Sequence, residues 1–189
     1  MKRLKQFVSE SEGLSFSFNL QDAAFVQYSG YPAATVSSLR QRLDVVQDFD
    51  PELVFLVIGS NDLADFNNSP QSVANAICDL VDTLLYILHV PTVVTCQILH
   101  RTVPHCQVRH PVDLLWFNDR VDQTNQKLME LLEVSHPGRA KFWHCKGFWN
   151  PVSKASAFSK DGVHLSVPGQ YKFYNAIRAA LVAYLNGNI

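Results

Sequence analysis

The sequence predicts an α/β protein in which helices cover both faces of a mainly parallel sheet. Short apolar runs rich in β-branched residues alternate with longer segments whose apolar residues recur three and four positions apart. The run Val54–Ile58 is apolar without a break, as expected for a strand buried on both faces. Small polar residues follow several runs, at the strand ends where open α/β sheets bind ligands.

The composition narrows the class of protein without deciding its function. The chain has 189 residues, 47% of them hydrophobic, which is enough for one domain with its own core. A formal net charge of −1 gives no electrostatic reason to expect nucleic acid as a partner. No apolar run is long enough to span a bilayer, and no signal peptide is recognisable, so we expect a cytoplasmic protein. Nothing in the sequence indicates an oligomeric state.

The beginning of the chain is predicted to be helical. Leu4 and Val8 stand four positions apart with polar residues between them, which favours a helix over residues 1–12 that ends at Gly13. Because this helix starts at the first residue, no strand is predicted before it.

The remaining elements follow from two patterns. Runs of β-branched and aromatic residues predict strands, and apolar residues at helical spacing, often behind a proline, predict helices. Alternating strands and helices indicate βαβ units with right-handed crossovers, in one domain covering residues 1–189. Strands are expected over residues 23–28, 53–58, 92–99 and 141–145, and helices over 32–46, 69–89, 114–134 and from 168 onward.

Polar clusters lie at the ends of three predicted segments. Gly30 follows the first predicted strand, Gly59-Ser60-Asn61-Asp62 follows the second, and Asp161-Gly162-Val163-His164 precedes the last helix. Each alone has an ordinary structural explanation: a turn glycine, a capping asparagine or a surface histidine. Asp62 is expected to hold backbone groups of its turn.

Together these clusters suggest acyl-transfer chemistry. Asp161 and His164 are three positions apart on one loop, so the carboxylate can fix one imidazole nitrogen and leave the other free as a base. The Asn61 amide and the Gly30 backbone N–H can stabilise an oxyanion, and one such donor is typically worth about 3–4 kcal/mol in the transition state. Only a nucleophile is lacking.

With these motifs in order, the chain resembles the SGNH hydrolase superfamily, also called GDSL-type esterases and lipases. Gly30 matches the second family motif, Gly59–Asp62 the third and Asp161–His164 the fourth. The resemblance covers nearly the whole chain. It implies a three-layer α/β/α sandwich with a flavodoxin-like, mainly parallel sheet, and it implies hydrolysis of small acyl or acetyl esters of lipids, sugars or other alcohols.

The resemblance also implies roles for individual residues. His164 would act as the base, Asp161 would orient it, and Gly30 and Asn61 would form the oxyanion hole. Ser60 is expected to contact substrate, and Trp149 either lines an acyl or sugar pocket or covers the core beneath a long loop. No metal or organic cofactor is implied.

The departure from the family concerns its first motif, Gly-Asp-Ser, which occurs nowhere in the chain. In the family this motif ends the first strand, so we expect the first strand to be missing together with the nucleophile. That strand lies inside the sheet, and each buried unpaired backbone group it leaves would cost about 1–3 kcal/mol. Ser29 and Ser60 are near the predicted site but poorly placed to replace the nucleophile.

Two explanations compete. N-terminal truncation of a serine esterase is favoured, because drift of an active site would replace the serine and keep the strand. The alternative is a pseudoenzyme, a non-catalytic module that binds an acyl or glycan ligand or another protein. In both cases residues 1–189 are predicted to have no turnover.

A third, weaker hypothesis concerns a loop rich in cysteine and histidine. Its thiols and imidazoles could bind zinc, although their spacing matches no paired ligand motif. Arg101 and Arg109 in the same loop could contact an anionic substrate group or form surface salt links. The four cysteines are expected to be reduced. The zinc candidates are Cys96, His100, His105, Cys106 and His110.

Overall fold

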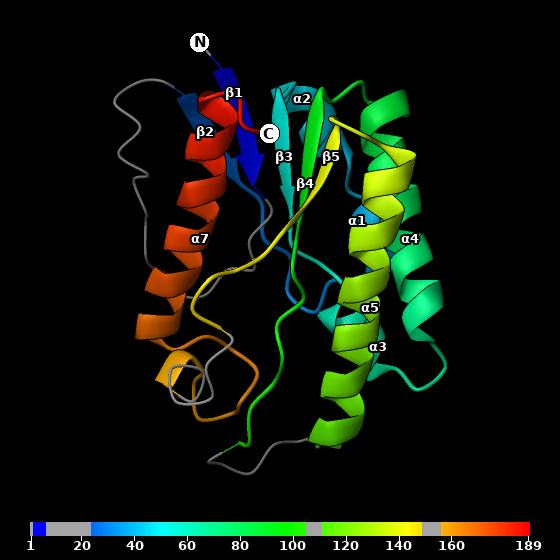
Figure 1. Ribbon diagram of the computed structural model, residues 1–189, viewed down its shortest axis with the longest axis vertical. Helices are drawn as coiled ribbons and strands as arrows, with labels where there is room; N and C mark the ends of the chain where they lie inside the picture. Colours follow the sequence, from blue (N-terminus) through cyan, green and yellow to red (C-terminus); the bar gives the residue numbers. More distant parts are fainter. Residues whose placement is uncertain (1, 7–23, 105–110, 149–155) are drawn as a thin grey trace.

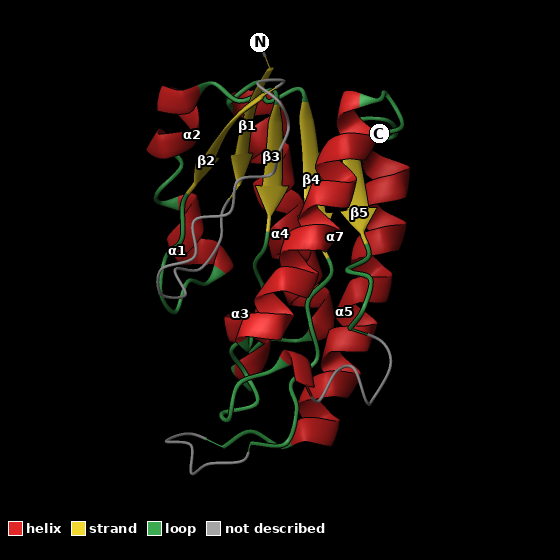
Figure 2. Cartoon of the chain, turned by 90° about the vertical axis from the view of Figure 1, so that its left-hand side faces the viewer, coloured by secondary structure: helices red, strands yellow, loops and turns green. Residues whose placement is uncertain are grey.

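A computed structural model describes residues 2–6, 24–104, 111–148 and 156–189. Five strands form one sheet in the order β2-β1-β3-β4-β5, and all four pairs of neighbours are parallel. The strands therefore point toward one end of the molecule (Figure 2). They are β1 (Lys2–Gln6), β2 (Ala24–Tyr28), β3 (Leu53–Leu56), β4 (Thr92–Cys96) and β5 (Ala140–Trp143).

Helices cover both faces of this sheet, with α7 on one side and α4 and α5 on the other (Figure 1). A π-helical turn, η1 (Thr83–Ile87), directly continues α4. This arrangement confirms the α/β class with a parallel sheet between helices. The helices are α1 (Val36–Arg40), α2 (Asp44–Phe49), α3 (Ser60–Ala64), α4 (Pro70–Asp82), α5 (Leu114–Ser135) and α7 (Val167–Leu185).

The core lies on both faces of β3, as its unbroken apolar run predicts. Val54 and Leu56 pack in one cluster with side chains of α1, α4 and α5, whereas Leu53 and Phe55 pack in a second cluster beneath α7. All four side chains are buried. Burial of one such side chain stabilises the fold by about 1.5–3 kcal/mol, so β3 anchors both layers.

The prediction of a helix at the start of the chain is wrong for residues 2–6, which form β1. This strand lies between β2 and β3, where Leu4 is in register with Val26 on one side and with Leu53 on the other. The first strand, which the sequence predicts to be missing, is therefore present inside the sheet. The backbone hydrogen bonds that β1 forms with β2 and β3 outweigh the weak helical preference of this segment. Without β1, the facing edges of β2 and β3 would have unpaired backbone groups inside the sheet.

The other elements follow the predictions with shifted boundaries. The predicted helix over residues 32–46 is divided by a turn at residues 41–43 into α1 and α2. The predicted helix over residues 69–89 is confirmed: Ser69 caps α4 through a capping box with Ser72, and η1 extends the helix to Ile87.

Two further features of the described residues bear on the sequence predictions. Within the described ranges, no helix combines the length and the apolar character that a membrane span needs. Cys78, Cys96 and Cys145 are free thiols, and Cys106 lies outside the described residues.

Candidate active site

The loop before α7 holds the predicted aspartate and histidine together. Asp161 Oδ2 lies 2.6 Å from His164 Nδ1. The loop closes on itself, because Ser159 N donates to the His164 carbonyl at 2.7 Å and Phe158 bridges to Leu165. Ser166 then caps α7 by accepting from Gly169 N, so the loop leads directly into the helix.

Asp161 is held in its ionised form. Partial burial raises its pKa, but hydrogen bonds from His164, Ser159 and the backbone N–H groups of Val163 and His164 outweigh that effect, so the pKa lies well below its usual range. Asp161 Oδ1 accepts from Ser159 Oγ at 2.7 Å and from both backbone N–H groups at 2.9 Å. An ionised carboxylate only accepts, so the proton between Asp161 and His164 resides on Nδ1.

The other imidazole nitrogen faces outward. The His164 side chain is 72% exposed, and Nε2 has no hydrogen-bond partner among the described residues. With the proton on Nδ1, Nε2 carries the lone pair and is the atom that can take a proton from a nucleophile.

Gly162, between these two residues, has no room for a side chain. Its φ is +73°, a conformation that favours glycine, and a Cβ atom there would lie 2.2 Å from the Thr102 carbonyl oxygen. Thr102 N also donates to the Gly162 carbonyl at 2.9 Å. The Asp161–His164 loop is therefore packed directly against the backbone that follows β4.

The second predicted cluster forms the turn from β3 into α3. Gly59 has φ +110°, and a Cβ atom there would lie 2.7 Å from the Ile98 side chain, so this turn also requires glycine. Asn61, in the first turn of α3, is exposed, and its Nδ2 donates to the Ala34 carbonyl at 2.9 Å. That contact uses one of the two Nδ2 hydrogens and orients the amide.

Asp62 joins the same turn to α1. Its carboxylate oxygens lie 3.1 and 3.2 Å from Val36 N at the start of that helix. Burial raises the Asp62 pKa, and the hydrogen bonds from the backbone N–H groups of Val36 and Asp62 partly oppose that effect. Asp62 therefore contacts backbone, as predicted, although the Val36 group belongs to a different turn from its own.

Gly30 follows β2, in the loop that leads to Ala34. Because Asn61 bonds to Ala34, this loop and the α3 turn are directly connected at the carboxyl end of the sheet. The loop that contains Gly30 and the turn that contains Asn61, the two predicted oxyanion donors, are therefore in contact through Ala34.

Ser60 contacts an arginine. Arg101 Nη2 donates to the Ser60 carbonyl at 3.3 Å and to Ser60 Oγ at 3.4 Å. The Arg101 guanidinium also lies over the Phe117 ring, 4.1 Å from its centroid. The sequence predicts for Arg101 either a contact to an anionic substrate group or a surface salt link, and no sequence pattern indicates its bond to Ser60.

Some predicted residues cannot be placed in this arrangement. Trp149 lies outside the described residues, as do Arg109 and three of the zinc candidates, His105, Cys106 and His110. Cys96 is buried beside Cys145, and His100 Nε2 lies 2.6 Å from Asp122 Oδ1. The described part of the chain contains no group of three or more His, Cys, Asp or Glu residues suited to a metal ion.

Comparison with protein families gives a match over most of the chain. The model of the GDSL-like lipase/acylhydrolase family matches residues 12–172, which include Gly30 and both of the other motifs. A search of curated proteins gave no match.

Solved structures of enzymes share the fold at low sequence identity. A lipase/acylhydrolase from Enterococcus faecalis has a TM-score of 0.66 at 16% identity, over 100% of this chain and 97% of that one. A carbohydrate acetylesterase from Sinorhizobium meliloti has a TM-score of 0.68 at 16% identity, over 97% and 100%. A carbohydrate esterase family 3 protein from Talaromyces cellulolyticus has a TM-score of 0.71 at 12% identity, over 99% of both chains.

Proposed function

We propose, since the chain belongs to the GDSL-like lipase/acylhydrolase family, that it is a serine ester hydrolase. One observation carries this proposal. His164 has its Nδ1 fixed by an ionised carboxylate at 2.6 Å and its Nε2 exposed and unoccupied among the described residues. That is the state in which an imidazole acts as a general base.

The proposed reaction has two halves. His164 Nε2 takes the proton of a serine hydroxyl as the serine oxygen attacks the ester carbonyl, while Asp161 keeps the ring oriented and stabilises the imidazolium. The remaining Asn61 N–H and the Gly30 backbone N–H stabilise the oxyanion. His164 then gives its proton to the leaving alcohol, and water releases the acid in the same way.

The position of β1 changes where the nucleophile is sought. In the family the nucleophilic serine follows the first strand, and β1 occupies that place in the sheet. The sequence after Gln6 reads Phe7-Val8-Ser9-Glu10-Ser11, and it lies outside the described residues. Ser9 and Ser11 are therefore the first serines to test. The proposal therefore departs from the prediction of no turnover, which depended on the absence of both Gly-Asp-Ser and the first strand, because β1 is present.

The proposed substrates are small acyl or acetyl esters of a lipid, a sugar or another alcohol. Two structural neighbours are described as a carbohydrate acetylesterase and a carbohydrate esterase, which supports acetylated sugars as the first substrates to examine. The cytoplasmic location predicted from the sequence remains a prediction.

Hydrolysis of p-nitrophenyl acetate tests the proposal. The protein is expected to release p-nitrophenol, His164→Ala is expected to remove this activity, and Ser9→Ala and Ser11→Ala should separate the nucleophile from its neighbour. Turnover unchanged in His164→Ala would contradict the proposed chemistry. Turnover that is lost in His164→Ala but survives both serine changes would exclude these two serines.

The second candidate function is a non-catalytic module that binds an ester or glycan. The absence of Gly-Asp-Ser from the sequence favours it. Calorimetric binding of an acetylated sugar, by a protein that gives no turnover of that sugar or of p-nitrophenyl acetate, would support this function over the enzyme.

A further inference from the structure

We propose that the segment Ile98–Thr102, called here the linking segment, positions both halves of the candidate active site, and that Arg101 is its positioning residue. Arg101 holds the turn that carries Asn61, and the next residue, Thr102, holds the loop that carries His164. The effect on catalysis rests on the proposed function, whereas the connection itself is a property of the fold.

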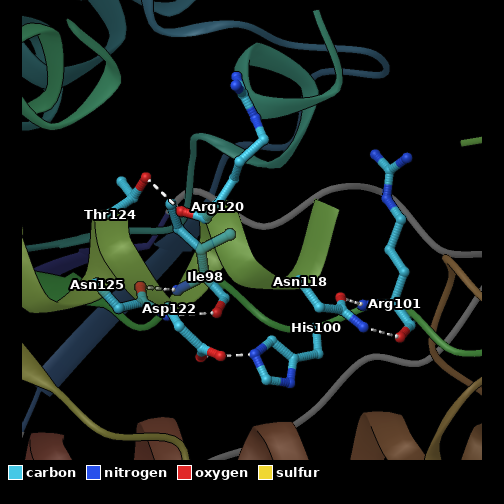
Figure 3. A network of polar contacts seen from close by, with 8 residues as sticks. All are labelled: Ile98, His100, Arg101, Asn118, Arg120, Asp122, Thr124 and Asn125. Atoms are coloured by element: carbon cyan, nitrogen blue, oxygen red, sulfur yellow. Dashed lines mark hydrogen bonds and ion pairs between the residues drawn. The ribbon is translucent and has the colours of Figure 1, made fainter. Parts of the chain in front are cut away.

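The linking segment is fixed to α5 by two asparagine side chains. Asn125 accepts from Ile98 N and donates to the Ile98 carbonyl, both at 2.9 Å. Asn118 accepts from Arg101 N at 2.9 Å and donates to its carbonyl at 3.1 Å. Figure 3 shows both amides facing the segment, as spacing of seven residues on one helix allows.

These two side-chain amides provide hydrogen-bond partners for the backbone beyond the end of β4, where the ladder with β5 has stopped. The last ladder contact beyond β4 is from Gln97 N to the Trp143 carbonyl, at 2.9 Å. Backbone groups after that point need other partners, and a side-chain amide satisfies one N–H and one C=O at once. His100, which lies between the residues bonded by Asn125 and Asn118, contacts Asp122 of the same helix (Figure 3). The segment is therefore rigidly placed along α5.

From this anchored backbone, the Arg101 side chain reaches the α3 turn. Its Nη2 donates to the carbonyl oxygen and to Oγ of Ser60. The guanidinium group stacks on the Phe117 ring of α5. Among the described residues Arg101 forms no ion pair, so its bonds are directed to Ser60. Ser60 precedes Asn61, and a shift of this peptide therefore moves the oxyanion donor.

Thr102 makes the second connection. It donates to the Gly162 carbonyl, and its own carbonyl occupies the space that a side chain at residue 162 would need. The charges agree with this geometry: burial lowers the Arg101 pKa, and the nearby negative charge of Asp161 raises it again. Two adjacent residues thus set the distance between the oxyanion donor and the base.

A matched control exists at the other end of the sheet. Arg139 is also half-buried, donates to the carbonyls of Leu85 and Val90 at 3.1 and 3.3 Å, and lies over the Tyr86 ring at 5.2 Å. It has the same kind of contacts as Arg101 but touches neither half of the site. Arg139→Met therefore measures what loss of such an arginine does to stability alone.

The kinetic test is a double-mutant cycle with p-nitrophenyl acetate. Arg101→Met is expected to lower kcat about 100-fold with little change in KM, because a misplacement of about 1 Å has an effect of that size. Arg101→Lys should retain an intermediate kcat, and Arg139→Met should retain wild-type kcat. In an Asn61→Ala background, Arg101→Met should lower kcat by less than about 10-fold, since the donor it positions is gone and only its effect through Thr102 on the His164 loop remains. A full 100-fold loss in that background, or in Arg139→Met, would overturn the proposal.

Nuclear magnetic resonance tests the connection without turnover. Arg101→Met is expected to shift both the Asn61 side-chain amide signals and the Gly162 backbone N–H signal, whereas Arg139→Met should leave both in place. A shift in only one of them, or in neither, would overturn the proposed link. If the wild-type protein hydrolyses no ester, the proposed function fails while this measurement still decides whether the link exists.

Discussion

Two histidine–carboxylate pairs at opposite ends of the sheet have similar contact distances and different surroundings. His164 Nδ1 lies 2.6 Å from Asp161, and His136 Nε2 lies 2.8 Å from Asp82. The His164 side chain is 72% exposed, whereas that of His136 is 6% exposed. The difference lies in the second nitrogen of each ring.

Both ring nitrogens of His136 have a partner. Its Nδ1 lies 3.2 Å from the Tyr86 hydroxyl, and its Nε2 lies 2.8 Å from Asp82 Oδ1. Its carbonyl accepts from Arg139 N and Ala140 N, both at 3.1 Å, where the chain turns from α5 into β5. A short contact between histidine and aspartate is thus not sufficient for a base: the opposite nitrogen must be free.

The largest expected effect breaks the exposed pair. His164→Ala should lower kcat/KM for p-nitrophenyl acetate by about 10⁶-fold, because the base is then absent. His136→Ala should leave kcat/KM within about 2-fold, since a nitrogen that is already bonded takes no proton from a nucleophile. Steady-state assays of both variants at one pH make the comparison, and equal losses in the two would contradict it.

Replacement of the two aspartates should likewise affect kcat at Asp161 and not at Asp82. Asp161→Asn is expected to lower kcat by about 10⁴-fold, because an amide donor favours the wrong imidazole tautomer at His164. Asp82→Asn serves as the control and should leave kcat unchanged. An Asp161→Asn enzyme with near wild-type kcat would show that the ring is oriented by other groups.

Loss of the proposed oxyanion donor, Asn61, should have a smaller effect on catalysis. Asn61→Ala should lower kcat by about 10²–10³-fold with little change in KM, as loss of one preorganised donor does. Asn61→Asp, of nearly the same size, should be no better, because a carboxylate there repels the developing charge. Activity retained in both variants would remove Asn61 from the oxyanion hole.

The buried pair should reveal itself in stability. His136→Ala is expected to lower the free energy of unfolding by about 1–3 kcal/mol, because Asp82 and the Tyr86 hydroxyl lose the buried imidazole as a partner. Urea unfolding measures the change. His164→Ala, at an exposed position, should lower it by less than about 0.5 kcal/mol. The reverse order would overturn the assignment of one pair to stability and the other to chemistry.

The smallest effect concerns pH. The pKa of Asp161 lies well below its usual range in the folded protein, so its contribution to stability is present above about pH 4 and is lost as the pH falls further. The difference in unfolding free energy between wild type and Asp161→Asn should be about 1–2 kcal/mol at pH 7 and should shrink below about pH 4. A difference that grows on acidification would contradict the sign.

Features with a local pattern could be predicted from the sequence. The unbroken apolar run of β3 indicates burial on both faces, and the Asp161–His164 spacing places both groups on one loop. The family resemblance, drawn from three short motifs, is confirmed by the family match.

Features that depend on distant backbone could not be predicted. β1 is a strand because its backbone pairs with β2 on one side and with β3 on the other. Its own residues, Lys2–Gln6, show no apolar alternation that would predict a strand. In the sequence, Asn118 and Asn125 are ordinary polar positions on a helix. Their role in binding the backbone of the linking segment becomes visible only in the structure. In both cases the decisive partner lies more than fifteen residues away in the chain.

The contact between Gly162 and the Thr102 carbonyl has a consequence for the divergence of related sequences. Most steric conflicts in a protein can be relieved by a second substitution that trims the opposing side chain. Here the opposing atom is a backbone oxygen, which every amino acid carries, so no change at residue 102 makes room for a larger residue at 162. Position 162 therefore has no compensating partner, and relatives that keep this loop geometry are expected to keep glycine there whatever ester they hydrolyse.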